Sequence, residues 1–180
     1  MVQLRDNELS ARGLIERGGE AAAVCADFGV PFILNDRPDL ALACGADGVH
    51  VGQDDAPPSV AREILGPDAV IGLSTHASEE WTLAAHEPVD YLSAGPVNAT
   101  PTKPGRAGTG VGYLSYAAST SLGSTMPWFV TGGVTPETIP DMAANGARRF
   151  VVVRYLTESD EPESAARRLR VAVDSAAGWG

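Results

Sequence analysis

Short apolar runs alternate with stretches of helical periodicity along this chain. Each run is brief and ends in polar residues or glycine, as buried strands of a parallel sheet do. Between the runs, apolar residues recur at intervals of three and four, which predicts amphipathic helices. The predicted strands cover residues 2–5, 30–34, 48–51, 69–73, 89–94, 128–131 and 150–153. The predicted helices cover residues 8–28, 39–44, 57–65, 78–86, 111–122, 135–145 and 163–176.

Strict alternation of strand and helix predicts an α/β fold with a parallel sheet. About seven such units in residues 1–180, with no change of composition between them, indicate one TIM (β/α)₈-type barrel domain. The pattern lacks the first strand and helix of such a barrel, so we expect an incomplete one. A doubly wound open sheet is the alternative, but it normally carries a glycine-rich turn after its first strand, and this sequence has none there.

Composition narrows the class of protein. The formal net charge is −10 and the pI is about 4.6, without a basic block, which argues against a nucleic-acid partner. The two cysteines, Cys25 and Cys44, fall inside predicted helices, which argues against a disulfide framework and indicates a reducing compartment. No signal peptide or membrane-spanning run is visible. We therefore expect a soluble, cytoplasmic protein with no membrane partner.

Carboxylates follow two successive predicted strands. Asp36 comes after the run that ends at Leu34, and Asp55 comes shortly after the run that ends at Val51. Because parallel strands end at one edge of the sheet, we expect the two side chains to converge there. Two carboxylates at such an edge suit Mg²⁺ held between protein and phosphate. Each Asp could instead cap the next helix, and Asp54 could take the place of Asp55.

Candidate phosphate-binding groups lie near other strand ends. Gln3 and Arg5 occupy alternate positions of the first strand and share one face, where Arg5 either binds an anion or forms a structural ion pair. The loop 100–106 gathers hydroxyls, a lysine and an arginine, which suit a phosphate better than a plain solvated turn does. The pair Gly132-Gly133 follows a late strand, where barrels frequently bind phosphate on backbone amides, although a tight turn explains it nearly as well.

Serine and histidine residues give weaker signals. Ser74 and His76 follow the fourth predicted strand, with no acidic partner or nucleophile-elbow pattern nearby, which argues against a hydrolytic triad. Helix capping is the default interpretation for Ser74, and His76 fits a satisfied histidine at the rim. His50 lies in mid-strand and is more typical of a structural residue than of a ligand.

Taken together, these segments resemble the thiamine-phosphate synthases. The resemblance includes Val2-Gln-Leu-Arg-Asp6, Asn35-Asp-Arg37 and Thr100-Pro-Thr-Lys-Pro-Gly-Arg106. Further matching pieces are residues 45–55, 71–76, 95–96, 127–129, 132–133, 146–149 and 151–154. The resemblance implies a TIM barrel and a transferase. The implied reaction condenses 4-amino-2-methyl-5-hydroxymethylpyrimidine diphosphate with a thiazole phosphate, giving thiamine monophosphate and pyrophosphate.

The resemblance also implies roles for individual residues. Mg²⁺ would be bound by Asp36 and Asp55, and the pyrophosphate or pyrimidine would be contacted by Ser74 and Lys103. The rest of the pyrimidine diphosphate site would comprise Gln3, Arg5 and Asn35. The thiazole phosphate site would comprise Thr100, Thr102, Gly132 and Gly133. Arg5, Lys103 and Ser74 would act in catalysis, and no side-chain nucleophile is required. The implied partners are these small molecules, and a homo-oligomer is compatible with the sequence.

The chain departs from the family pattern at several points. Asn7 stands where the family usually has a lysine that binds the diphosphate, and Asn98-Ala99 replaces a common aromatic-and-proline pair. A missing first strand would leave two unpaired sheet edges, unless the chain begins upstream of Met1 or a partner fills the gap. Two alternatives therefore stay open: a thiazole tautomerase-like isomerase with His76 as acid/base, and a truncated, non-catalytic phosphate-binding homologue.

Overall fold

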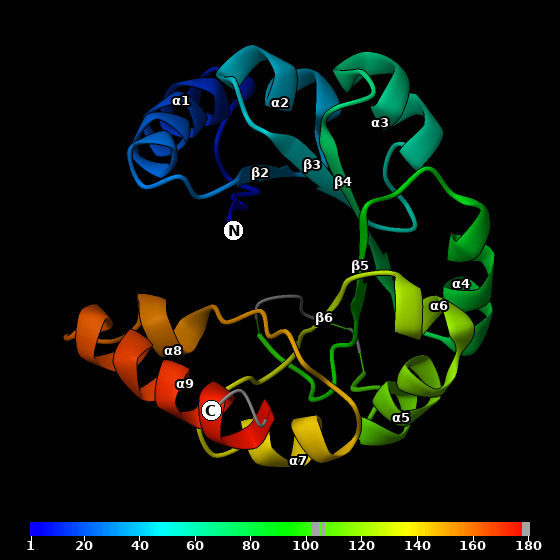
Figure 1. The fold of residues 1–180 in the computed structure, drawn as a ribbon. Helices are drawn as coiled ribbons and strands as arrows, with labels where there is room; N and C mark the ends of the chain where they lie inside the picture. Colours follow the sequence, from blue (N-terminus) through cyan, green and yellow to red (C-terminus); the bar gives the residue numbers. More distant parts are fainter. Residues whose placement is uncertain (102–104, 106, 178–180) are drawn as a thin grey trace. The chain divides into compact units, whose positions relative to one another are not determined.

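The computed structural model describes residues 1–101, 105 and 107–177. Its strands are hydrogen-bonded in sequence order, from β1 through β6 (Figure 1). The pairs β1–β2, β2–β3, β3–β4 and β5–β6 are all parallel, which confirms the predicted α/β fold with a parallel sheet. The strands are β1 (Val2–Leu4), β2 (Phe32–Asn35), β3 (Gly48–Val51), β4 (Val70–Thr75), β5 (Tyr91–Ala94) and β6 (Trp128–Val130).

A helical segment follows every strand. These segments are α1 (Ala11–Asp27), α2 (Pro38–Cys44), α3 (Pro58–Leu65), α4 (Ser78–Leu83), the 3₁₀-helix η1 (Ala84–His86), α5 (Val111–Ser119), α6 (Ser121–Thr125), α7 (Ile139–Ala144), α8 (Arg154–Thr157) and α9 (Pro162–Ala177). Local sequence explains several boundaries. Ser10 accepts a hydrogen bond from the Gly13 amide and caps α1, and Gly29 follows that helix with a φ of +61°.

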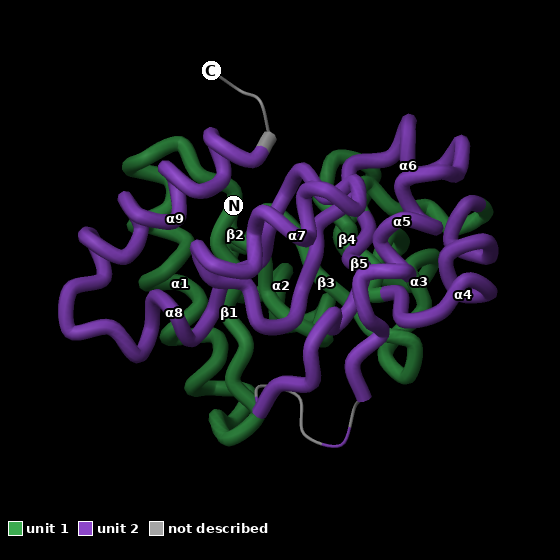
Figure 2. The backbone as a smooth tube through the Cα atoms, turned by 90° about the horizontal axis from the view of Figure 1, so that it is seen from below, with its two compact units in different colours: residues 1–74, 86–91 green, residues 75–85, 92–180 purple. Residues whose placement is uncertain are grey.

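The chain forms two compact units, which Figure 2 colours separately. Unit 1 consists of residues 1–74 and 86–91. Within it, α2 contacts both α1 and α3, and these helices lie along β2 and β3 (Figure 1). The register partners Leu34, Val49 and Ile71 are all at most 1% exposed and form the apolar row of the sheet.

The neighbouring row of unit 1 is polar. Asn35, His50 and Gly72 are register partners of one another, one step along from the apolar row. Because successive side chains of a strand point to opposite faces, this row lies on the other face of the sheet. Asn35 and His50 are buried as well, so this face holds buried polar groups that need hydrogen-bond partners.

Unit 2 consists of residues 75–85 and 92–180. Its core is aromatic: Trp81 stands edge-on to Tyr113 and to Trp128, with ring centroids 6.3 and 5.8 Å apart. The helix α9 packs against α7 and α8, and α5 contacts α4, α6 and α7. The prediction of one domain over residues 1–180 stays a prediction beside this division into two compact units.

Several details differ from the sequence prediction. Phe150 forms only an isolated parallel bridge with Val130, so the count of seven strand–helix units is not confirmed. The helix expected over 111–122 is interrupted at Thr120, whose extended backbone ends α5 and whose hydroxyl caps α6. The helix expected from Thr135 begins at Ile139, because Thr135 and Thr138 close a turn instead. The short helix α8 was not predicted.

The predictions about the two cysteines and about membrane-spanning segments can be compared with the structure. Cys25 and Cys44 are buried, unpaired thiols. Across the described residues, none of the helices combines the length and apolar character needed to cross a bilayer.

Candidate active site

Asp36 occupies a special backbone position directly after β2. Its φ is +64°, in the left-handed region that Asp and Asn tolerate better than most residues. The Asp36 amide donates to the His50 carbonyl of β3 over 2.8 Å, which continues the ladder between the two strands. The carboxylate is therefore held by its own backbone at the carboxyl edge of the sheet, next to the buried Asn35.

Asp55 lies at the end of the adjacent strand. β3 stops at Val51, and the Asp55 carboxylate accepts a hydrogen bond of 2.7 Å from the Gly52 amide, closing a short turn. One oxygen of this exposed side chain is thereby fixed. The structure thus brings Asp36 and Asp55 to the carboxyl ends of neighbouring strands of unit 1, as the sequence predicts.

This pair suits a divalent cation shared with a ligand. Among the described residues, three or more His, Cys, Asp or Glu side chains do not cluster closely enough to hold a metal alone. Mg²⁺ commonly binds through one or two carboxylates and completes its shell with water and substrate phosphate. The donor set therefore fits Mg²⁺ that arrives with a phosphate better than it fits a resident structural ion.

Gln3 and Arg5 belong to the same unit. Gln3 is in β1, paired with Ile33 of β2, and Arg5 follows the last residue of β1. The Gln3 side chain forms a hydrogen bond with the Tyr91 hydroxyl. Arg5 is half-buried, so a guanidinium lies close to the edge where β1 ends.

Ser74 takes part in a buried chain of hydrogen bonds. Its hydroxyl lies 2.9 Å from His50 Nε2, and His50 Nδ1 lies 2.9 Å from the Tyr91 hydroxyl. The imidazole also stacks on the Tyr91 ring, with centroids 5.3 Å apart. Burial raises the pKa of Tyr91 above its usual range, and the hydrogen bond from Gln3 partly offsets this.

This arrangement is not a hydrolytic triad. The group that orients His50 is a neutral phenol, whereas a triad needs a carboxylate that stabilises the imidazolium. The expectation that Ser74 caps a helix is not supported either: α4 begins at Ser78 and follows Ala77. The Ser74 carbonyl is fixed too, since it accepts a hydrogen bond of 2.7 Å from Gln53 Nε2.

The glycine pair of unit 2 forms a tightly packed turn after β6. Gly132 and Gly133 have φ values of +99° and +73°, which glycine adopts without strain. Asn98 donates from its amide side chain to the Gly132 carbonyl over 3.3 Å, and Thr138 donates to the Gly133 carbonyl over 2.9 Å. The loops that follow β5 and β6 are thereby joined, and Asn98 is the residue that joins them.

The loop 100–106 is only partly described. Thr100 is half-buried, whereas Thr102 and Lys103 lie outside the described residues, so their predicted roles stay predictions. His76 is held within unit 2. Its Nδ1 forms a hydrogen bond with the Gly95 carbonyl, and its amide donates to Glu80 over 2.7 Å.

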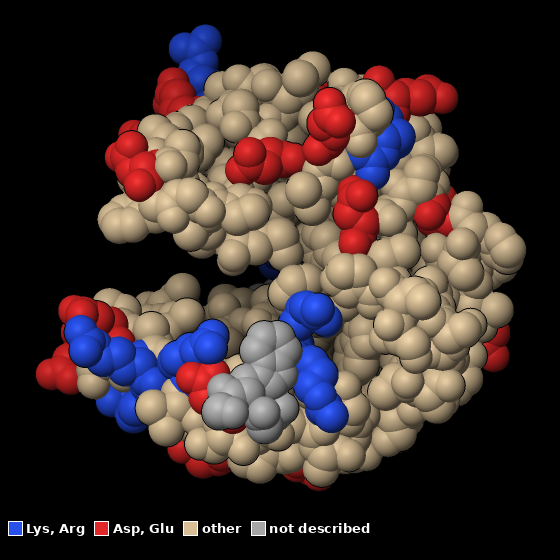
Figure 3. Space-filling view, in the orientation of Figure 1, with Lys and Arg blue, Asp and Glu red and all other residues tan. Residues whose placement is uncertain are grey.

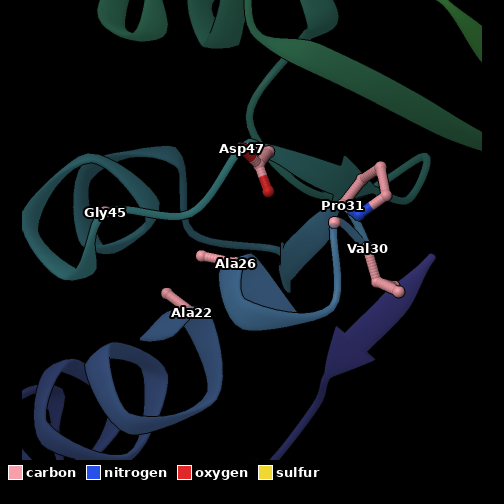
Figure 4. Close-up of a pocket in the computed structure, with 7 residues that line it drawn as sticks. Ala22, Ala26, Val30, Pro31, Gly45 and Asp47 are labelled. Atoms are coloured by element: carbon pink, nitrogen blue, oxygen red, sulfur yellow. The ribbon is translucent and has the colours of Figure 1, made fainter. Parts of the chain in front are cut away.

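A shallow cavity of about 260 Å³ in unit 1 lies elsewhere (Figure 4). Its lining includes Val30 and Pro31 before β2 and Asp47 before β3, so it opens at the amino ends of the strands. The Asp47 carboxylate accepts a hydrogen bond of 2.7 Å from the Phe32 amide and joins those strand starts. Barrel-type enzymes act at the carboxyl edge, so this cavity is not the candidate site.

Charge is distributed unequally between the units. Unit 1 contains 5 basic and 14 acidic residues, and unit 2 contains 8 and 9. Figure 3 shows arginines gathered over α8 and α9, where the chain carries Arg154, Arg167, Arg168 and Arg170. Anionic ligands would therefore need a cation at unit 1 more than at unit 2.

Sequence reasoning missed Tyr91 and undervalued His50. Only the register, which pairs His50 with Gly72, brings the imidazole beside Tyr91. A signal was nevertheless present. Gly72 is a glycine inside an apolar strand, and such a glycine often marks the close approach of another group.

Comparisons with known proteins point to one family. The family model described as thiamine monophosphate synthase matches residues 1–156. A thiamine-phosphate synthase of Thermus thermophilus is 47% identical over 170 residues, covering 94% of this chain and 81% of that protein. A thiamine-phosphate synthase of Mycobacterium bovis is 44% identical, and the match covers 98% of this chain and 83% of that protein. A solved thiamine phosphate pyrophosphorylase from Pyrococcus furiosus superposes with a TM-score of 0.85 at 28% identity, covering 97% and 82%.

Proposed function

Because this chain belongs to the thiamine monophosphate synthase family, we infer that it is a thiamine-phosphate synthase, a transferase of thiamine biosynthesis. It condenses 4-amino-2-methyl-5-hydroxymethylpyrimidine diphosphate with thiazole phosphate, giving thiamine monophosphate and pyrophosphate. The observation that carries this inference is the family match over residues 1–156, which contains the predicted strand-end residues in order.

Unit 1 is proposed to bind the pyrimidine diphosphate. Arg5 supplies a half-buried cationic group for the diphosphate, and Gln3, Asn35 and Ser74 supply polar contacts. Support comes from their common place: all belong to unit 1, and Asn35 and Ser74 are buried polar residues at the ends of β2 and β4. Such buried groups bind a ligand with little loss of side-chain entropy.

Mg²⁺ is the proposed cofactor, and Asp36 and Asp55 are the residues that would hold it. When bound, it would neutralise part of the negative charge that develops on the departing pyrophosphate. The acidic balance of unit 1 supports this assignment, because a diphosphate would otherwise approach carboxylates without compensation.

Unit 2 is proposed to bind the thiazole phosphate. Gly132 and Gly133 leave their backbone open to close approach, and Thr100 and Thr102 add hydroxyl donors. Lys103 is proposed to contact the pyrophosphate. The positive φ values of the two glycines and their support by Asn98 and Thr138 favour this role.

The chemistry requires no protein nucleophile. The bond between the pyrimidine methylene carbon and the diphosphate oxygen breaks, and the electron pair leaves with pyrophosphate. The lone pair of the thiazole nitrogen then forms the new carbon–nitrogen bond. Arg5 and Lys103 stabilise the leaving charge, Ser74 holds the pyrimidine half, and the alignment of the two substrates supplies much of the rate.

The finer expectations about fold and setting accompany this function as proposals. They are a TIM (β/α)₈-type barrel that would need one further strand and helix, a cytoplasmic location, and assembly into a homo-oligomer. The superposition on the Pyrococcus furiosus protein supports the first, since it covers 97% of this chain.

The test is an assay of the purified chain with both substrates and Mg²⁺, in which thiamine monophosphate and pyrophosphate are measured together. We expect equal amounts of both products, with none when thiazole phosphate is omitted. Thiazole isomerisation without condensation would favour the tautomerase alternative. Substrate binding without any product would favour the non-catalytic homologue.

A further inference from the structure

A continuous chain of hydrogen bonds crosses the polar face of unit 1. It runs from Gln3 in β1 to Tyr91 in β5, then to His50 in β3 and on to Ser74 in β4. The two His50 contacts are both 2.9 Å long. Two of these four residues, Gln3 and Ser74, are proposed substrate contacts, whereas His50 and Tyr91 have no role in the reaction described above.

The packing around Tyr91 and His50 depends on a missing side chain. Gly72 is the register partner of His50, and a Cβ at this position would overlap both the Tyr91 ring and His50 Nδ1. Glycine inside a strand weakens it, so close approach of another group is the usual reason for finding one there. The cavity left by Gly72 is filled by the stacked pair, which fixes both rings in one arrangement.

The hydrogen bonds of this chain have a direction. A phenol is a stronger hydrogen-bond donor than acceptor, and the unprotonated nitrogen of a neutral imidazole, here 2.9 Å away, is the stronger acceptor of the two groups. The hydrogen of the buried, neutral phenol then goes to His50 Nδ1, which acts as an acceptor. In a neutral imidazole the other nitrogen carries the proton, so Nε2–H donates to the Ser74 oxygen.

We propose that Tyr91 and His50 are positioning residues that make the Ser74 hydroxyl a hydrogen-bond donor to the pyrimidine diphosphate. A hydroxyl that accepts from Nε2–H does not donate its own hydrogen to His50. The ring nitrogens and phosphate oxygens of this substrate are acceptors, so a serine with that orientation is complementary to them. The proposal rests on the proposed function for the identity of the substrate, but the polarity of the chain does not.

The donor-to-acceptor direction of these hydrogen bonds can be tested without substrate. In protein labelled with ¹⁵N-histidine, long-range ¹H–¹⁵N spectra distinguish the two neutral tautomers of imidazole. The chain has three histidines, so His76→Gln and His86→Gln assign the signals. We expect His50 in the Nε2–H form at neutral pH, with a shift toward the Nδ1–H form in Tyr91→Phe. An Nδ1–H or doubly protonated His50 in the unaltered chain would overturn the proposal, whatever the enzyme's activity.

Two histidine variants test the consequence for catalysis. The amide nitrogen of Gln reaches the position of Nε2 and can still donate to Ser74, whereas the shorter Asn side chain cannot. We expect His50→Gln to keep kcat/KM for the pyrimidine diphosphate within about threefold of the original. His50→Asn and Tyr91→Phe should lower it by about tenfold, as the loss of one hydrogen bond would. The KM for thiazole phosphate should not change.

The control is His86→Gln, an exposed histidine of the same unit, which should leave all constants unchanged. A purely structural role for the pair predicts that both His50 variants lose stability and activity alike and that both substrates are affected. That result would contradict the proposal. If the unaltered chain forms no product, the proposed function fails, and the tautomer measurement alone decides the polarity.

Discussion

Unit 1 and unit 2 are built from the same repeating element, a parallel strand followed by a helical segment, yet their strands end in different chemistry. Strands of unit 1 end beside carboxylates and buried polar side chains, and its residues include 5 basic and 14 acidic ones. Unit 2 contains 8 basic and 9 acidic residues, and the loop after β6 presents two glycines with positive φ values. Polar side chains therefore gather at the strand ends of unit 1, and the loop after β6 of unit 2 has backbone that a ligand can approach closely.

Under the proposed function, this contrast lets one architecture serve two ligands. A diphosphate that must depart needs groups that respond to developing charge, such as a cation between carboxylates and a nearby guanidinium. A phosphate that only anchors the second substrate can be held by backbone amides and hydroxyls. If the two units divide the work in this way, substitutions in unit 1 should affect turnover, and substitutions in unit 2 should affect affinity for thiazole phosphate.

The largest effect is expected from Asp36→Asn. Asn tolerates the φ of +64° about as well as Asp does, so the substitution removes the charge without straining the backbone. Losing one of the two carboxylates proposed to hold Mg²⁺ should lower kcat by at least about a hundredfold. Steady-state kinetics over a range of Mg²⁺ concentrations would measure this, together with a raised Mg²⁺ requirement.

Asp39→Asn is the matched control. Asp39 lies in the first turn of α2, where it pairs with Arg37 over 2.6 Å and is about half exposed. The Arg37 hydrogen bond lowers the pKa of this carboxyl, so the pair contributes at neutral pH and is lost as the pH falls below the usual value for Asp. Kinetics should be unaffected. Full activity of the Asp36 variant would remove the metal role from unit 1.

Asn7→Lys should act in the opposite direction. Asn7 is exposed in the turn between β1 and α1, where Asp6 accepts hydrogen bonds from the Glu8 and Leu9 amides. A lysine there would add one charge-assisted contact to the diphosphate, worth about 1.5–3 kcal/mol, or roughly ten- to a hundredfold in kcat/KM. Asn7→Gln, which adds length without charge, should change little. An equal gain in both variants would show that charge is not the cause.

Arg62→Ala tests how much the contacts of one arginine contribute to the stability of unit 1. Arg62 donates to the carbonyls of Gly66, Pro67, Ala69 and Pro88 and pairs with Asp90 over 2.7 Å. It therefore ties the segment 86–91 to the rest of the unit. Losing these contacts should lower the free energy of unfolding by about 1.5–3 kcal/mol, measured in urea.

The control for that variant is Arg17→Ala on the exposed face of α1. Arg17 lies 3.6 Å from Glu20, and both side chains are mostly exposed, so its removal should cost less than about 0.5 kcal/mol. Similar losses of unfolding free energy in the two arginine variants would mean that the Arg62 contacts contribute no more than an exposed surface ion pair does. Neither variant should change the KM for thiazole phosphate if the units divide the work as proposed.

Much of the fold could be predicted because the apolar runs are short and strictly alternate with helical periodicity. Six of the seven expected strands have counterparts within two residues at each end, and one of them, 48–51, matches β3 without change. The strand predicted at the end of the series, over residues 150–153, did not form, and the reason is physical. Residues 150–153 have the apolar character of a strand, but pairing with Val130 is limited to one bridge, and pairing is a tertiary property.

The candidate site was predictable only where position along a strand determines position in space. Asp36 and Asp55 follow adjacent strands, so the parallel architecture was enough to bring them to one edge. Tyr91 and His50 could not be paired in this way, since their contact depends on the register of β3 with β4 and on the space left by Gly72. The contact of Asn98 with the glycine turn depends equally on how two loops pack.

The smallest effect is expected from Gly133→Ala, and it bears most directly on the contrast between the units. A Cβ at Gly133 would lie 3.1 Å from Asn98 Nδ2, a side chain that can move, and the φ of +73° would cost about 1–2 kcal/mol. The KM for thiazole phosphate should rise by about five- to thirtyfold, with the KM for the pyrimidine diphosphate unchanged. Gly112→Ala in α5, where a Cβ meets nothing within 4 Å, should leave both constants alone. A loss confined to the pyrimidine diphosphate would place the two substrates the other way round, because the open backbone of unit 2 would then be serving the departing group.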